Sequence, residues 1–214
     1  MLKSLVKDLA GTADICKTVS NLSKTLAAAY LLPGETLLFA FASPKEEFAF
    51  TNEALITVCG ENATTTRKLV SRFDYREHQL SHVQFETTGR VDRDCEIKFQ
   101  IGEYWMSIDV ARKEEELVKT HYKALVVLAR EQRGRRRNWD LCQSALNNSS
   151  DALRLNALDA PSSQTLTEHA EGTLGWLQSD FDRLNPRNYH SAIQAAVSGA
   201  APASGSERHR HSYA

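Results

Sequence analysis

The period of the hydrophobic positions changes twice along the chain. Over the first thirty or so residues, apolar side chains recur at steps of three and four, which predicts an N-terminal amphipathic helix over residues 1–31. The segment Leu32-Pro33-Gly34-Glu35 ends this helix, because a residue before proline disfavours the helical conformation and glycine permits a turn. We therefore expect a helical segment ahead of the first strand.

From Thr36 to Asp109, apolar and polar residues alternate in short segments rich in β-branched and aromatic side chains, a pattern typical of β-strands. Turn-forming pairs such as Ser43-Pro44 and Gly102-Glu103 separate these segments. Many short strands joined by hairpin-length loops predict a small antiparallel barrel or sandwich. The seven predicted strands span residues 36–42, 47–51, 54–59, 65–71, 83–88, 96–101 and 104–108.

Helical periodicity returns after Ala111. Gly134 and the three arginines that follow it are expected to interrupt the pattern. A capping-box sequence at Thr165 then begins an apolar stripe that extends to Leu184. The sequence thus predicts helices over residues 111–133, 138–158, 166–184 and, more weakly, 189–197.

The last residues of the chain are mostly Gly, Ala, Pro, Ser, Arg and His, a composition typical of a disordered tail. Together with the change of period, this composition divides the chain into four parts. They are an N-terminal amphipathic helix (1–31), a β-domain closed by a helix (32–129), a helical extension (130–197) and a tail (198–214).

Three segments of the predicted β-domain match the sequence pattern of a known family. Two are short: Leu32–Glu35, ahead of the first strand, and Phe50-Thr51-Asn52. The third, Val83–Lys98, agrees with the family motif in one gapless block at Glu86, Gly89, Asp92, Asp94 and Glu96. Over about residues 31–128, the chain resembles the bacterial pleckstrin-homology-like (PH-like) family.

This resemblance implies an α+β fold, a small antiparallel PH-like β-barrel or sandwich of about seven strands that is capped by a helix. It also implies a non-catalytic interaction or scaffolding role and self-association through sheet edges. In the PH superfamily, basic residues around the first hairpin loop hold inositol lipids. Here that loop contains Lys45 beside Glu46 and Glu47, so we expect no inositol-lipid binding there.

Composition alone is that of an ordinary globular chain, with 42% hydrophobic and 25% charged residues among 214. The formal net charge of −1 excludes a uniformly basic or uniformly acidic binding protein. The charge is unevenly distributed, however. The β-domain from Pro33 to Val110 is acidic, whereas both flanking regions are mildly basic.

The cysteine spacing and the length of the apolar runs both bear on where the protein is located. The four cysteines lack the spacing of a zinc site or a disulfide scaffold. The longest apolar run, Leu26–Leu32, is far shorter than the roughly 20 residues that span a bilayer. We therefore expect a cytoplasmic protein without a transmembrane segment.

The sequence offers little for catalysis. His78 and His82 are four residues apart, but no glutamate follows the first histidine as in helical zinc-protease motifs. Nucleophile-elbow, Walker and dinucleotide-binding motifs are also absent from the sequence. We predict that the protein is not an enzyme.

Three carboxylates of the family motif, Asp92, Asp94 and Glu96, alternate and so share one strand face. Such a face could hold a hard cation such as Ca²⁺ or Mg²⁺. The segment lacks the carbonyl-supplying loop and closing glutamate of a calcium site, and Arg90 and Arg93 lie beside it. We favour a salt-bridged face and predict neither a metal nor a cofactor; a metal-dependent enzyme built on this face is the most distant alternative.

An arginine-rich segment is the candidate anion-binding site. Nucleic acid or anionic lipid could bind there, and Trp139 beside it suits a membrane interface. Alternatively, the arginines form a solvated helix end. The members of this segment are Arg130, Arg133, Arg135, Arg136 and Arg137.

The apolar stripes of residues 2–26 and 166–184 could pack on each other as a bundle, or they could recruit a protein partner or a second copy. We predict a non-catalytic interaction or scaffolding protein that self-associates. The alternative is a peripheral-membrane or nucleic-acid adaptor that uses the arginine-rich segment 130–137.

Overall fold

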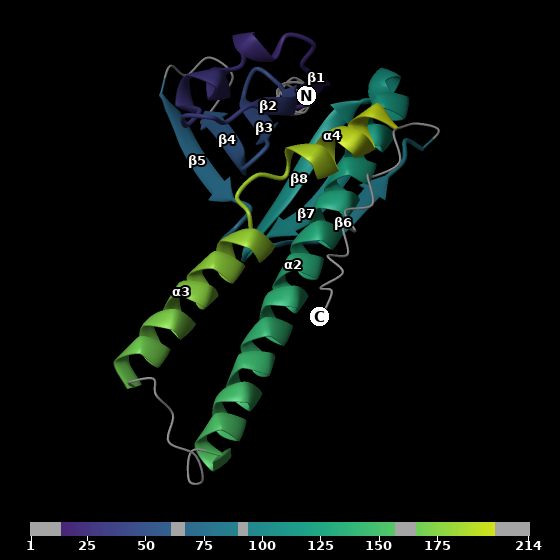
Figure 1. The fold of residues 1–214 in the computed structure, drawn as a ribbon. Coiled ribbons are helices and arrows are strands. Elements are labelled where there is room, and N and C mark those ends of the chain that lie inside the picture. The colour runs from purple at the N-terminus through teal and green to yellow at the C-terminus, as the bar shows by residue number, and fades with distance from the viewer. Residues whose placement is uncertain (1–13, 61–66, 90–93, 157–165, 200–214) are drawn as a thin grey trace, which may run out of the picture.

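Two antiparallel sheets and a long helix make up the body of the protein in a computed structural model, which describes residues 14–60, 67–89, 94–156 and 166–199 (Figure 1). The first sheet has five strands in the order of the chain. They are β1 (Lys17–Thr18), β2 (Leu37–Ala42), β3 (Glu46–Thr51), β4 (Ala54–Gly60) and β5 (Lys68–Asp74).

The second sheet has three strands, β6 (Leu80–Glu86), β7 (Asp94–Ile101) and β8 (Tyr104–Ala111). Cys16, next to β1, joins the sheets at one edge: its N–H donates to the carbonyl of Asp109 at 2.7 Å and its carbonyl accepts from Ala111 at 3.0 Å. The seven predicted strands and the antiparallel PH-like fold are confirmed. The sheets form a sandwich rather than a closed barrel.

The predicted N-terminal helix is wrong for residues 14–31. This segment holds β1 and two short 3₁₀ helices, η1 (Leu22–Lys24) and η2 (Leu26–Tyr30). Tertiary contacts replace the helical hydrogen bonds, since the Glu47 carboxylate accepts from the N–H groups of Leu26 and Ala27 at 2.9 and 2.8 Å. The rest of that prediction, residues 1–13, lies outside the described residues, as does the predicted tail after Gly199.

An aromatic core fills the space between the sheets. Phe39 and Phe50 stack with ring centroids 4.5 Å apart, and Phe41 and Phe99 pack around them, all at most 4% exposed. Alternating burial along β7 shows how the predicted period of two turns one face of the strand inward. These strands therefore bury their apolar positions as the sequence indicates.

Helix α2 (Glu115–Asn156) follows the short η3 (Arg112–Glu114) and closes the open side of the sandwich. Its first half buries Val118, Leu125 and Leu128 in the core. The predicted interruption at Gly134 is wrong, because α2 continues through it. One glycine weakens a helix by only about 1 kcal/mol, and no proline follows to stop it.

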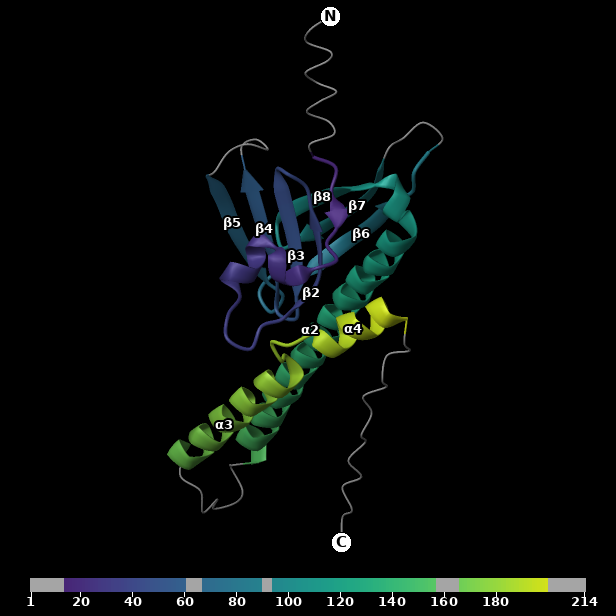
Figure 2. The ribbon, with the colours of Figure 1, turned by 90° about the horizontal axis from the view of Figure 1, so that it is seen from above.

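Two further helices confirm the predicted extension, α3 (Leu166–Leu184) and α4 (His190–Ser198). Helix α4 returns to the body and packs against α2 and β2, with Ile193 buried. Helix α3 runs beside the second half of α2, and the two views show this helical hairpin extending away from both sheets (Figures 1 and 2).

Candidate functional site

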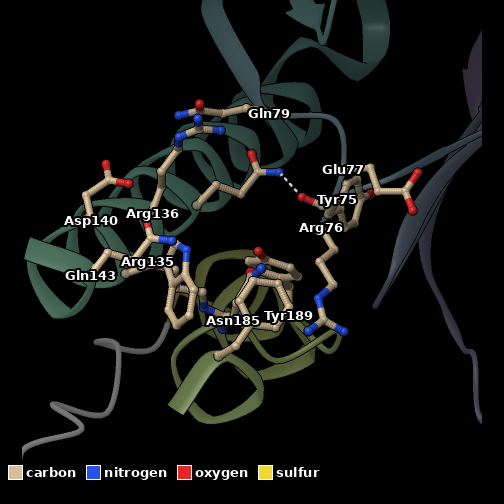
Figure 3. Close-up of a pocket in the computed structure, with 13 residues that line it drawn as sticks. Tyr75, Arg76, Glu77, Gln79, Arg135, Arg136, Asp140, Gln143, Asn185 and Tyr189 are labelled. Carbon is tan, nitrogen blue, oxygen red and sulfur yellow. Dashed lines mark hydrogen bonds between the residues drawn. The ribbon is translucent and has the colours of Figure 1, made fainter. Parts of the chain in front are cut away.

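Helix α2 separates the five arginines of the predicted anion site. Arg130, Arg133 and Arg137 are exposed, and they follow one helical face at steps of three and four. Arg135, which is half-buried, and Arg136, which is exposed, line a cavity of about 330 Å³ where the hairpin joins the sheets (Figure 3). The arginine-rich segment is therefore not one site.

Three parts of the chain enclose this cavity, which we call the junction cavity. They are the connection between β5 and β6 (residues 75–79), one face of α2 (residues 132–143) and the end of α3 with the following residues (181–189). The connection belongs to the sheets and the other two parts belong to the hairpin or its base (Figure 3). Ligand sites commonly occupy such boundaries between structural units.

Arg135 holds the base of the hairpin together. Its guanidinium pairs with Glu131 at 3.0 Å, donates to the carbonyl of Pro186 at 2.9 Å and lies 3.9 Å from the ring centre of Tyr189. Burial raises the pKa of Tyr189, while the Arg135 charge opposes that shift. Arg135 thus binds the segment after α3 by charge, hydrogen bond and cation–π contact.

Arg76 makes the corresponding contact from the sheets. It pairs with Asp182 at 2.7 Å and lies 4.5 Å from the ring centre of Phe181, which in turn meets Trp139 edge-on at 4.9 Å. Sequence reasoning missed Arg76, because no local motif surrounds it. It meets the hairpin only through a fold that joins positions more than a hundred residues apart.

Gln132 fixes α2 to the connection between the sheets. Its side-chain amide donates to the carbonyls of Tyr75 and His78 at 2.7 and 3.0 Å, and its oxygen accepts from the N–H of Leu80 at 2.8 Å. Gln132 is only 5% exposed, so these bonds satisfy groups that water cannot reach. Gln132 therefore attaches α2 to residues 75–80 by three hydrogen bonds.

Comparisons with known proteins agree with this architecture. A family model described as "Bacterial PH domain" matches residues 4–129, more than half of the chain. The chain belongs to the bacterial PH domain family. The family match ends just before Arg130, so the arginine-rich segment and the hairpin lie outside it.

Three proteins with which the chain was compared are similar to it. One is a PH-domain-containing protein from Exiguobacterium sibiricum 255-15, whose crystal structure is 31% identical in sequence with a TM-score of 0.76. The match covers 86% of this chain and 100% of that protein's chain. Protein YvbH of Bacillus subtilis (strain 168) is 38% identical over 133 residues, 60% of this chain. The match spans 65% of the length of YvbH. A Shewanella loihica PV-4 protein with a PH domain is 21% identical, with a TM-score of 0.43 and 54% and 97% coverage.

The acidic face of the PH domain is ion-paired. Lys98 contacts Glu86 at 3.1 Å and Glu96 at 2.6 Å, and the Ser107 hydroxyl donates to Glu96. Burial opposes the shift, but these two partners lower the pKa of Glu96. Asp94 begins β7 and Gly89 is exposed after β6, whereas Asp92, Arg90 and Arg93 lie outside the described residues. Within the described residues, no cluster of three His, Cys, Asp or Glu is placed to hold a metal.

Burial and aromatic contacts constrain four of the described histidines and cysteines. His121 is 3% exposed between Phe39 and Phe41, and burial lowers its pKa to about 4. Burial raises the pKa of Cys16 to about 12. The pair His78 and His82 is also divided, since His78 meets Phe73 and His82 meets Trp105.

The first hairpin loop of the PH domain has its charges engaged. Lys45 pairs with Asp14 at 3.2 Å, and Glu47 is buried against η2. Burial, and then Asp14, raise the pKa of Glu46. Separately, none of the described helices is both long and apolar enough to cross a membrane.

Proposed function

We propose that this chain is a non-catalytic interaction protein, in which the PH domain carries a helical hairpin that associates with a second copy of the chain. The observation that carries this proposal is the exposure of large apolar side chains on both helices of the hairpin. Leu141 on α2 and Leu174 and Trp176 on α3 are 58%, 57% and 43% exposed. Large apolar side chains that stay exposed on both helices of a hairpin are candidates for contact with a partner.

Charge complementarity supports a second copy as the partner. Between positions 130 and 140, α2 carries five arginines and two carboxylates. Along its length, α3 carries four carboxylates and one arginine. The basic helix of one copy can therefore lie against the acidic helix of the other while the apolar side chains pack between them.

A sheet edge is the other surface at which copies could meet. Strand β5 lies at the edge of the five-stranded sheet, and its Leu69 is 69% exposed. Exposed edge strands present unpaired backbone groups to other chains. The hairpin exposes three large apolar side chains and β5 exposes one, so we assign the association to the hairpin and treat the edge as the competing outcome.

The test is the molar mass of the full chain by light scattering coupled to size-exclusion chromatography. We expect the unaltered chain to be larger than a monomer, and the triple variant Leu141→Glu, Leu174→Glu and Trp176→Glu to be monomeric. Leu69→Glu is the matched control and should leave the mass unchanged. A monomeric Leu69→Glu variant beside an associated triple variant would assign the contact to the sheet edge, and circular dichroism checks the folding of each.

A second candidate, adaptor binding to an anionic membrane surface, follows from Arg130, Arg133 and Arg137. They share one exposed face of α2 and have no ion pair among the described residues. Each basic residue near such a surface contributes about 1 kcal/mol. Co-sedimentation with phosphatidylserine vesicles should fall sharply when all three become glutamine, whereas preferential binding to duplex DNA would point to a nucleic-acid partner instead.

A further inference from the structure

Some of the polar side chains that line the junction cavity take no part in attaching the hairpin to the sheets. Arg135 and Arg76 are engaged in holding the base together, as described above. Arg136 has no hydrogen bond or ion pair within the described part of the chain, although it lines the same cavity. We propose that the junction cavity binds a small aromatic carboxylate, with Arg136 as the anchor of its carboxylate group.

The geometry of arginine favours this ligand chemistry. A guanidinium presents parallel N–H donors that match the two oxygens of a carboxylate, and charge-assisted bonds of this kind are among the stronger ones in proteins. Arg136 and Arg135 project from adjacent positions of α2, and Figure 3 shows Arg136 extending toward Gln79 of the connection between the sheets. Arg136 is exposed, and it lies at the rim of the cavity.

Aromatic side chains supply the apolar wall. The half-buried Trp139 and Phe181 come from the two helices of the hairpin, whereas Tyr189, from the segment after α3, is only 1% exposed and adds little surface. Trp139 and Phe181 meet edge-on at 4.9 Å, and Tyr189 meets Tyr75 edge-on at 5.8 Å. A planar ring that enters this space can make further offset or edge contacts of the same kind. The volume of about 330 Å³ lies at the small end of ligand cavities.

Two carboxylates limit the charge that the cavity accepts. Glu77 and Asp140 also line it, and neither has an ion pair within the described residues. Arg76 and Arg135 are already paired, so Arg136 shares the cavity with two free carboxylates, and these oppose any negative charge beyond one carboxylate in direct contact with Arg136. A monoanion is therefore favoured over a nucleotide or an inositol phosphate.

The test is equilibrium dialysis of radiolabelled benzoate against the full chain. For a ligand of so few atoms, we expect a dissociation constant in the range of about 0.1 to 10 mM. Unlabelled AMP, inorganic phosphate and phenylalanine are the competitors, and each should displace benzoate less well than unlabelled benzoate does. Absence of binding at about 10 mM benzoate, or stronger displacement by AMP or phosphate, would overturn the proposal.

Three single variants assign the binding to the cavity. Arg136→Gln should weaken benzoate binding at least about tenfold, because it removes the charge-assisted bond. Arg137→Gln removes the same charge from the neighbouring exposed position and should change binding less than about twofold. Asp140→Asn should tighten binding, because it removes a repulsive charge. Equal losses in the two arginine variants would contradict an assigned site. Weaker benzoate binding by Asp140→Asn would show that Asp140 does not repel the bound carboxylate, and it would overturn the proposal.

Discussion

The two sheets and the helical hairpin use similar apolar side chains in opposite ways. In the PH domain, Phe41, Phe50 and Ile97 are fully buried between the sheets and the first half of α2. In the hairpin, Leu141, Leu174 and Trp176 remain largely exposed. The sheets enclose a core with packing partners on every side, whereas among the described residues α3 lies beside one helix, α2, over most of its length (Figures 1 and 2).

This difference gives the two regions different roles: the PH domain supplies the folding stability, and the hairpin leaves apolar side chains available to a partner. Most of the hydrophobic stabilisation lies in the PH domain, since stabilisation scales with the apolar area removed from water. The hairpin depends on polar contacts at its base, above all those of Gln132, Arg135 and Arg76. Changes in the sheets should therefore act on folding, and changes in the exposed part of the hairpin should act on association.

The largest expected effect is at the centre of the aromatic core. Phe50 contacts Phe39, Phe41 and Phe99 and is fully buried. Phe50→Ala should lower the free energy of unfolding by about 3 to 5 kcal/mol, because it removes buried area and leaves a cavity. The measurement is urea unfolding followed by circular dichroism.

Leu174→Ala is the matched change in the hairpin. Because Leu174 is exposed, we expect a change below about 0.5 kcal/mol in a monomeric background. If Leu174→Ala lowered the free energy of unfolding as much as Phe50→Ala does, the hairpin would be as tightly packed as the sheets. The contrast between the two regions would then be wrong.

A buried ion pair tests the polar part of the PH domain. Both oxygens of Glu35 accept from Arg72, at 3.0 and 2.8 Å, and the Glu35 side chain has no exposed surface. Arg72→Met should lower the free energy of unfolding by about 3 kcal/mol, since it leaves an unpaired buried carboxylate. The double variant with Glu35→Gln should lose less than the sum of the single losses, and strict additivity would argue against coupling of the pair.

The sequence predicts the sheets well because the alternation of apolar and polar residues and the two faces of a strand both have a period of two. A period of two places alternate residues inside, and β7 shows this along its whole length. The prediction failed at residues 14–31, where contacts to Glu47 and Ala40, distant in the chain, outweigh the local helical pattern. It failed again at Gly134, where the local preference against helix is too weak to stop α2.

The candidate site was predictable only in part. Arg135 and Arg136 could be singled out from the density of positive charge in one segment. Their separation from Arg130, Arg133 and Arg137 depends on which face of α2 meets the sheets. The contribution of Arg76 depends on the return of α3 beside α2, and a single sequence contains no local signal for either.

The pH dependence of stability should report on the core and not on the hairpin. Burial lowers the pKa of His121 from 6.5 to about 4, so the unfolded chain binds a proton in this range while the folded chain does not. Stability should therefore fall as pH falls from about 6.5 to about 4, by on the order of 2 to 3 kcal/mol from this group. His121→Phe, measured by urea unfolding across this range, should remove that part of the slope. An unchanged slope would mean that His121 is not buried as a neutral ring.

The variant is compared with the unaltered chain because other groups titrate in the same range with the opposite sign. Burial raises the pKa of Glu46 and of Asp109, and each shift favours the folded state as pH falls. Only the difference between the two profiles isolates His121. Phenylalanine keeps a ring against Phe39 and removes the unpartnered Nδ1 atom.

A small gain in stability tests whether α2 is continuous where the hairpin leaves the sheets. A Cβ atom at Gly134 would meet no atom within 4 Å, and this residue is exposed within a helix. Gly134→Ala should raise the free energy of unfolding by about 0.5 to 1 kcal/mol, because alanine has the higher helix propensity. At Gly102 the φ angle is +58° and an added Cβ would lie 2.9 Å from Cδ2 of His78, so Gly102→Ala should destabilise the protein. Destabilisation by Gly134→Ala would instead indicate a break in α2 and a hairpin hinged at that position.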